Sequence, residues 1–159
     1  ETKRDVTIVT NSAFIAGYAG RGLGTEFILL GGVYQKDSQV MVGPLVKQCA
    51  GSFCVDRLFL GADGWSPSAG FANSDHLRAQ AVRDMAAQAE AVAVLTESEK
   101  FSRRSVAPLQ LGDKLKTVIT DGDIPGAAAE TLRELGVQVI EVPARETGGA
   151  ASKPEKLTH

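Results

Sequence analysis

The feature that most constrains the fold is the segment 55–64, in which an apolar run gives way to small residues and a carboxylate. Val55 to Leu60 is mostly apolar, which predicts a strand buried on both faces of a sheet. Gly61-Ala62-Asp63-Gly64 follows where this strand stops. Small residues there let a ligand approach the backbone, and open α/β sheets bind ligands beyond the carboxyl ends of their strands. The segment therefore predicts a sheet strand that ends in one wall of a small-molecule pocket.

Short β-rich runs and helix signals alternate along the whole chain. The runs that we expect to form strands are residues 6–9, 26–30, 39–42, 55–60, 91–95, 117–120 and 137–142. The expected helices are residues 13–20, 44–50, 74–90 and 126–135. This alternation predicts an α/β fold, with a mostly parallel sheet and helices on both of its faces.

Several expected strands end in small or polar residues, and parallel strands bring such ends to one edge of a sheet. Thr10 and Asn11 follow the first strand, where donors can meet an anion. Asn11 could instead cap the next helix, which is the simpler interpretation for Ser12. Lys100 follows a later strand, either as an anion binder or as a solvated loop lysine. The other such strand ends are Gly31-Gly32, residues 61–64 and Thr120-Asp121.

The expected helix over residues 74–90 carries an apolar stripe with a spacing of four residues. Asn73 or Ser74 is the predicted N-cap, and Asp75 complements the positive end of the helix dipole. Asp75 and Arg78 are three positions apart and can face the same side. They could bind a polyol and a phosphate, respectively, or simply form a surface ion pair.

Two residues near this region have simpler interpretations than a binding role. Trp65 lies in a loop predicted over residues 65–70, where it could stack on a ligand but is more typical of a lid on the domain edge. His76 has no partner at a metal-ligand spacing, so we expect it to be exposed to solvent.

Composition indicates one ordinary globular domain and excludes several classes of protein. The chain has 159 residues, 43% of them hydrophobic and 23% charged. A net charge of -2 argues against binding nucleic acid through its phosphates, which needs a basic face. No apolar run is long enough to span a membrane, and the polar first residues are unlike a signal peptide. We therefore expect a cytoplasmic protein with no membrane partner.

The sequence contains no motif typical of a cofactor, metal or catalytic site. Cys49 and Cys54 are expected to be free thiols. Dinucleotide, Walker, nucleophile-elbow and metal-ligand patterns are missing from the sequence, so we assign no catalytic residue, metal ligand or cofactor. The first residue is Glu1 rather than Met, which indicates a fragment or a processed form.

Seven short motifs nevertheless occur in a recognisable order. They are Val9-Thr10-Asn11-Ser12, Leu30-Gly31-Gly32, Val42-Gly43-Pro44, Asp56-Arg57-Leu58-Phe59-Leu60-Gly61-Ala62-Asp63-Gly64, Ala69-Gly70-Phe71, Ser98-Glu99-Lys100-Phe101 and Ile119-Thr120-Asp121. Each motif is weak singly, but their order and spacing together resemble the C-terminal effector domain of DeoR-family bacterial transcriptional repressors. The resemblance covers about residues 6–142.

The resemblance implies a fold similar to that of ribose-phosphate isomerases, glucosamine-phosphate deaminases and CoA-transferases. It implies an effector domain over residues 1–145 that senses a phosphorylated sugar or a related metabolite and forms a homo-oligomer. It also implies that operator DNA is bound only by an N-terminal winged helix-turn-helix, which these residues do not include. Residues 146–159 are polar and are expected to form a disordered tail. The implied effector-binding residues are Thr10, Asn11, Gly31, Gly32, Gly43, Gly61, Asp63, Gly64, Asp75, Arg78 and Lys100.

The chain departs from the family pattern in three places. The family usually has another β-α unit before the Thr10-Asn11 pair, so a buried strand of the sheet is expected to be missing here. Glu97-Ser98-Glu99-Lys100-Phe101 replaces the family's usual Asp-Ser-Ser-Lys-Phe and adds a carboxylate beside the lysine. Gln80 stands where the family often has an acidic residue. The last two changes alter the charge that the site offers to an effector.

Two alternatives to a sensor remain open at this point. A sugar-phosphate isomerase or deaminase could use the same fold, because fold does not fix function. Asp63, Asp75 and Asp121 are available as a general base, although none forms a defensible catalytic pair. The chain could also be an oligomerisation domain with a vestigial pocket. A turnover assay separates the sensor from the enzyme, and a binding assay separates it from the scaffold.

Overall fold

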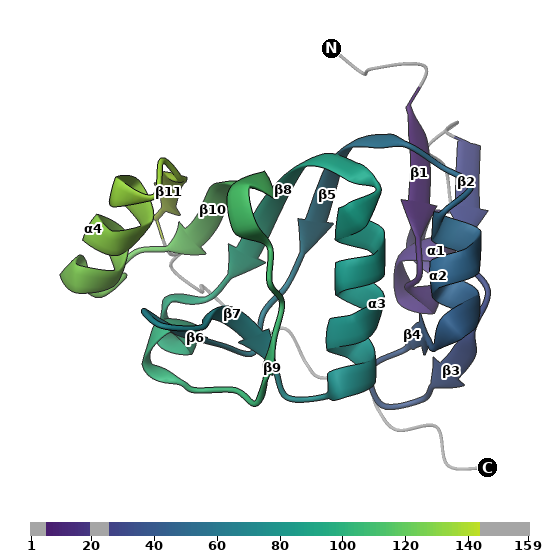
Figure 1. Ribbon diagram of the computed structural model, residues 1–159, viewed down its shortest axis with the longest axis horizontal. Helices are drawn as coiled ribbons and strands as arrows, with labels where there is room; N and C mark the ends of the chain where they lie inside the picture. The colour runs from purple at the N-terminus through teal and green to yellow at the C-terminus, as the bar shows by residue number, and fades with distance from the viewer. Residues whose placement is uncertain (1–5, 20–25, 144–159) are drawn as a thin grey trace, which may run out of the picture.

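The computed structural model describes residues 6–19 and 26–143. Strands and helices alternate along these residues, as Figure 1 shows. The elements of the first third are β1 (Thr7–Thr10), α1 (Ala13–Ala19), β2 (Glu26–Leu29), β3 (Val33–Gln35), β4 (Val40–Val42) and α2 (Pro44–Ala50). The middle elements are β5 (Val55–Leu60), β6 (Gly64–Ser66), β7 (Gly70–Asn73), α3 (His76–Ala87), β8 (Ala89–Thr96) and the 3-10 helix η1 (Ser98–Ser102). The last are β9 (Ala107–Pro108), η2 (Gly112–Lys114), β10 (Leu115–Asp121), α4 (Gly126–Glu134) and β11 (Gln138–Val142).

The sheet is parallel and lies in two pieces. Four parallel strands pair in the order β11-β10-β8-β5, and a separate parallel pair is formed by β1 and β2. The predicted α/β class with a mostly parallel sheet is therefore confirmed. Two small antiparallel units are added to it, the β3–β4 hairpin and the three-stranded unit β6-β7-β9.

Helix α3 belongs to both of the apolar cores that hold the fold together. It packs beside α2, as Figure 1 shows, and its small alanine side chains allow the neighbouring elements to approach the helix closely. Ala79 and Ala86 belong to a core with Val94 and Val118 of the four-stranded sheet. Ala81 belongs to a second core with Leu30, which follows β2, Val42 of β4 and Val46 of α2. Lys114 closes the far end of α3, because its ammonium donates to the carbonyl oxygens of Ala86 (3.0 Å) and Ala87 (2.8 Å).

Strand β5 is not buried on both faces, contrary to the prediction. It has the predicted bounds, but it is the edge strand of the four-stranded sheet, and Phe59 is 59% exposed. Strand β1 pairs only with β2, and β5 pairs only with β8. The other edge of each of these two strands therefore has no strand partner among the described residues. A small apolar crevice of about 30 Å³ adjoins both strands, lined by Val9, Leu30, Ala50, Phe53, Val55, Leu58, Met85 and Gln88. A further buried strand at this place remains a prediction.

The start of α3 and the surroundings of Trp65 also differ from the sequence prediction. Asp75, rather than Asn73 or Ser74, is the N-cap, and α3 ends at Ala87. Trp65 lies in strand β6, not in a loop, and is only 8% exposed. Its ring packs against Phe101 with a centroid distance of 5.8 Å, so Trp65 is a core residue and not a lid.

Two sequence predictions fall outside the described residues: the end of the first expected helix at residue 20, and the disordered tail at 146–159. Within the described part, no helix is both long enough and apolar enough to cross a membrane.

Candidate functional site

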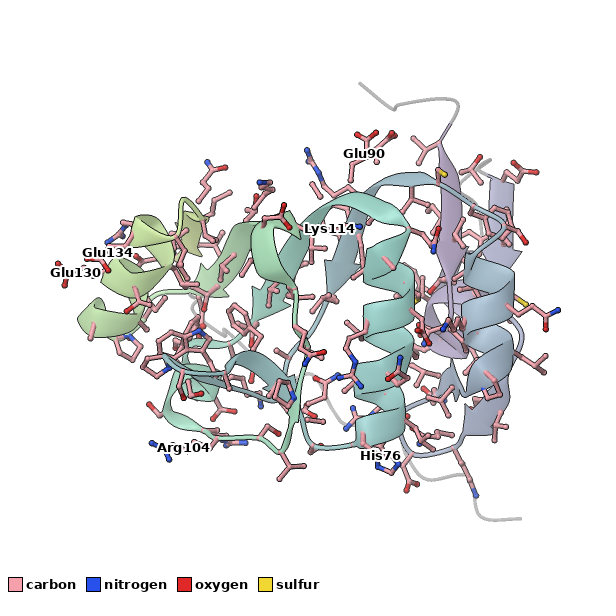
Figure 2. All side chains as sticks on the ribbon, in the orientation of Figure 1. His76, Glu90, Arg104, Lys114, Glu130 and Glu134 are labelled. Carbon is pink, nitrogen blue, oxygen red and sulfur yellow. The ribbon has the colours of Figure 1, made fainter. Side chains whose placement is uncertain are left out.

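Some of the predicted site residues, such as Asn11, Gly61 and Lys100, follow parallel strands at the carboxyl ends, where open α/β sheets bind ligands. Others follow strands of the antiparallel units, as Gly43 follows β4 and Asp75 follows β7. In the structure the predicted site residues form three separate groups, each held by its own hydrogen bonds. In Figure 2, His76 lies at the start of α3, on the side where Figure 1 shows β4 and β7, and Lys114 lies near the other end of the helix. His76 is exposed, as the sequence predicted.

The first group joins the ends of β1 and β2 to β4. The backbone of Leu30 donates to the Thr10 carbonyl (2.8 Å), which brings Gly31 and Gly32 close to Thr10. The Asn11 side-chain amide donates to the Met41 carbonyl at 2.8 Å. Asn11 therefore holds β4, next to Gly43, while Ser12 caps α1 by accepting from the Ile15 amide at 3.2 Å. Thr10 is buried, and its hydroxyl accepts from the Ser12 amide at 3.1 Å.

The second group, called the Asp63 group here, consists of Asp63, Ser74 and Arg78. One carboxylate oxygen of Asp63 accepts from the Ser74 amide (2.8 Å), the Ser74 hydroxyl (2.7 Å) and the Arg78 guanidinium (3.1 Å). Partial burial opposes ionisation of Asp63, but the hydrogen bonds from Ser74 and the charge of Arg78 outweigh it and lower its pKa. Asp63 is therefore ionised and forms an ion pair with Arg78. The Arg78 guanidinium does not pair with Asp75, although the three-residue spacing in the sequence allowed such a pair.

Asp75 links the Asp63 group to the β3–β4 hairpin. One of its carboxylate oxygens accepts from the Arg78 amide at 2.8 Å, which is an N-cap bond, and the other accepts from the Gln35 side chain at 3.4 Å. The bond from the Arg78 amide is the largest influence on Asp75 and lowers its pKa. Residues forty positions apart thus meet at the first turn of α3.

The third group surrounds Lys100 on η1. The Lys100 ammonium lies 2.9 Å from a Glu99 oxygen and 3.5 Å from a Glu97 oxygen, and Arg103 also pairs with Glu99 at 3.1 Å. The hydrogen bond with Glu99 raises the pKa of Lys100. Within the described residues, no hydrogen bond or ion pair connects Lys100 to the Asp63 group, so the structure does not bring these predicted site residues into contact.

The glycines of the 61–64 segment have different surroundings. A Cβ atom at Gly64 would lie 2.5 Å from the Arg103 carbonyl oxygen, because β6 packs directly on the segment after η1. At Gly61 the nearest atom to such a Cβ, the Leu95 carbonyl oxygen, is 3.8 Å away. Gly64 is therefore required by backbone packing, whereas a Cβ atom at Gly61 would make only an ordinary van der Waals contact.

The sequence interpretation missed a polar cavity between the β3–β4 turn and the start of α3. Its volume is about 480 Å³, and it is lined by Gln35, Lys36, Asp37, Ser38, Asp75 and Arg78. Only Asp75 and Arg78 were predicted as site residues. The sequence carries no signal for the others, because residues 36–39 resemble an ordinary polar turn and their approach to α3 is a long-range contact. Over the residues that the structure describes, no three histidine, cysteine or acidic side chains are placed to hold a metal ion.

A sequence profile and several known proteins that resemble this chain point to the same family. The sequence profile described as "DeoR C terminal sensor domain" matches residues 1–122. A relative from Escherichia coli O157:H7 named "Putative aga operon transcriptional repressor" is 32% identical over 138 residues, which are 87% of this chain and 51% of that protein. The transcriptional repressor AccR of Agrobacterium fabrum is 27% identical over 75% of this chain and 46% of its own length.

A third relative, the L-fucose operon activator of Haemophilus influenzae, is 26% identical over 75% of this chain and 48% of its own length. The chain thus spans about half the length of these curated relatives. The names include both repressors and an activator, so the relatives do not share one direction of control.

Proposed function

Because this chain belongs to the DeoR C-terminal sensor domain family, a family of regulatory sensing domains, we propose that it binds a phosphorylated sugar or a related metabolite. Binding of this effector would control DNA binding by an N-terminal helix-turn-helix domain of the full-length protein. The observation that carries the proposal is the family match over residues 1–122, which includes every predicted effector-binding residue from Thr10 to Lys100.

The geometry supports binding at the carboxyl edge of the strands. Polar groups from several elements lie there in three groups, and a cavity of about 480 Å³ opens beside Asp75 and Arg78. Small-molecule sites typically have volumes of about 300–1,000 Å³. Carboxylate, amide and guanidinium groups in such a cavity suit a ligand with several hydroxyls and an anionic group.

The same residues support a sensor better than an isomerase or a deaminase. A general base works best when its pKa lies near the operating pH. The hydrogen bonds described above lower the pKa values of Asp63 and Asp75, and a bond from the Ser98 amide lowers that of Asp121. The curated relatives are named as transcriptional regulators. We therefore propose that the bound ligand is sensed and not converted.

The proposed division of labour places DNA recognition outside the described domain. A net charge of -2 does not suit a phosphate-binding face. The chain spans about half of each relative's length, which leaves room for a DNA-binding domain in a longer protein. A cytoplasmic location and a homo-oligomeric state are further parts of this proposal.

A thermal-shift screen tests the function directly. A ligand that binds only the folded state at 100 times its Kd stabilises that state by about 2.7 kcal/mol, which raises the melting temperature of a domain of this size by roughly 5–10 °C. We expect such a rise with a sugar phosphate and no turnover of that ligand by chromatography. Turnover of the ligand would favour the enzyme, and no shift with any sugar phosphate or parent sugar would contradict the proposed function.

A further inference from the structure

The polar cavity between the β3–β4 turn and α3 contains two cations that the sequence analysis did not connect. They are Lys36, from the turn, and Arg78, from the first turn of α3. We propose that Lys36 and Arg78 form the subsite that binds the anionic group of the effector, a role that the position of Lys100 after a strand suggested for that lysine. This inference rests on the proposed function, because it assumes an effector that carries an anionic group.

The surroundings of the two lysines favour Lys36 as the anion binder. The Lys100 ammonium is already within 2.9 Å of Glu99 and 3.5 Å of Glu97, so an anion reaching it meets two carboxylates. Glu99 is the carboxylate that this chain adds to the family motif. Among the described residues, Lys36 takes part in no such ion pair. Its charge is therefore available to a ligand in the cavity.

Arg78 complements Lys36 because only part of its guanidinium is in use. One terminal nitrogen donates to Asp63 (3.1 Å) and to Ser74 (2.8 Å). A guanidinium has five N–H donors in a planar fork, and the remaining donors form no hydrogen bond with the described residues. The bonds to Asp63 and Ser74 hold this end of the guanidinium in place. A fixed, partly free guanidinium suits an oxyanion such as a phosphate.

The other lining groups suit hydroxyls. The Ser38 hydroxyl donates to the Gln35 side chain at 3.2 Å, and Gln35 donates to Asp75 at 3.4 Å, so the turn is tied to the helix start. The carboxylates of Asp75 and Asp37 repel an anion but have lone pairs that accept from hydroxyls. The cavity therefore fits a polyhydroxylated chain that carries one phosphate or a similar oxyanion.

Binding measurements with matched variants test the subsite. The probes are hexose 6-phosphates, hexosamine 6-phosphates and pentose 5-phosphates, and each is paired with its unphosphorylated sugar. Each probe is titrated by calorimetry into the wild type and into four variants. We expect Lys36→Ala to weaken binding of the phosphorylated probe by about 10-fold or more, because a charge-assisted hydrogen bond is lost. Lys36→Arg should keep most of the affinity, and the loss of affinity in Lys36→Ala should exceed the loss in Lys100→Ala. Lys47→Ala, at an exposed lysine on α2, is the matched control.

The outcomes separate the subsite from the function. A sugar phosphate that binds wild type and Lys36→Ala equally, but binds Lys100→Ala weakly, would overturn the subsite and leave the proposed function intact. Equal affinity of the wild type for a phosphorylated probe and its parent sugar would also overturn the subsite. Failure of every probe to bind the wild type would overturn both proposals. Because Lys36 is exposed, the melting temperatures of the unliganded variants should match, which shows that a lost affinity is not lost folding.

Discussion

Replacing Gly64 by alanine tests whether this glycine is a structural residue rather than part of the effector wall. The added Cβ would lie 2.5 Å from the Arg103 carbonyl oxygen and 3.1 Å from the carbonyl carbons of Arg103 and Arg104. All of these atoms are backbone, so they cannot swing aside. The strand must shift, which also strains the hydrogen bond from the Trp65 amide to the Arg103 carbonyl (2.9 Å).

The expected cost follows from these contacts. Overpacking typically costs about 1–3 kcal/mol, and a strained backbone hydrogen bond adds about 1 kcal/mol. We therefore expect Gly64→Ala to lower the free energy of unfolding by about 2–4 kcal/mol. Gly61→Ala is the matched control, because its nearest contact is 3.8 Å away. A glycine-to-alanine change without strain alters stability by less than about 1 kcal/mol.

Urea denaturation followed by circular dichroism and by the fluorescence of Trp65, the single tryptophan, measures both variants. Losses of stability that are equal in Gly64→Ala and Gly61→Ala would refute the reasoning from backbone contact. A stable Gly64→Ala variant that no longer binds effector would instead place this glycine in the binding wall.

Three further perturbations have defined outcomes. Phe101→Ala should cost about 3–5 kcal/mol in urea denaturation, because the ring is buried and packs on Trp65 and Phe71. Lys114→Ala should cost about 1 kcal/mol through loss of its bonds at the end of α3, whereas the exposed Lys116→Ala should be neutral. The pKa of Asp63 is lower in the folded state than its usual 3.8, so its contribution to stability is complete above that value and declines as pH falls below it. Unfolding free energies measured from pH 7 to pH 2 should therefore fall less steeply for Asp63→Asn than for wild type.

Each of these predictions has a contradicting result. A small effect of Phe101→Ala would mean that the β6–η1 packing contributes little. Equal effects of Lys114→Ala and Lys116→Ala would mean that the loss of a positive charge, and not the loss of the bonds at the end of α3, changes the stability. Parallel acid curves for Asp63→Asn and wild type would mean that the bonds from Ser74 and Arg78 do not survive in solution.

The sequence predicted the type of the longer elements better than their surroundings. The apolar run Val55–Leu60 is a strand with the predicted bounds. Its burial depends on which strands lie beside it, and that information is not local, so the exposure of Phe59 was not predictable from the run. Strand β6 was missed because three residues are too few to show a period of two, and Trp65 was consequently placed in a loop.

The candidate site divides in the same way. The positions of Asp63, Asp75 and Arg78 after a strand and at a helix start could be predicted from local patterns. Their partners could not, because Arg78 pairs with a residue fifteen positions away, and Gln35 meets Asp75 forty positions away. The sequence shows which charges are present, and only the folded backbone decides which carboxylate neutralises which cation.

The double membership of α3 in the two cores has a consequence for how the domain unfolds. Ala79 and Ala86 close one core, while Ala81, on another face of the same helix, closes the second. Loss of either core exposes one side of α3 and removes the wall on which the other core packs. The domain should therefore behave as a single cooperative unit, in which Trp65 fluorescence and the circular dichroism of the helices change at the same urea concentration.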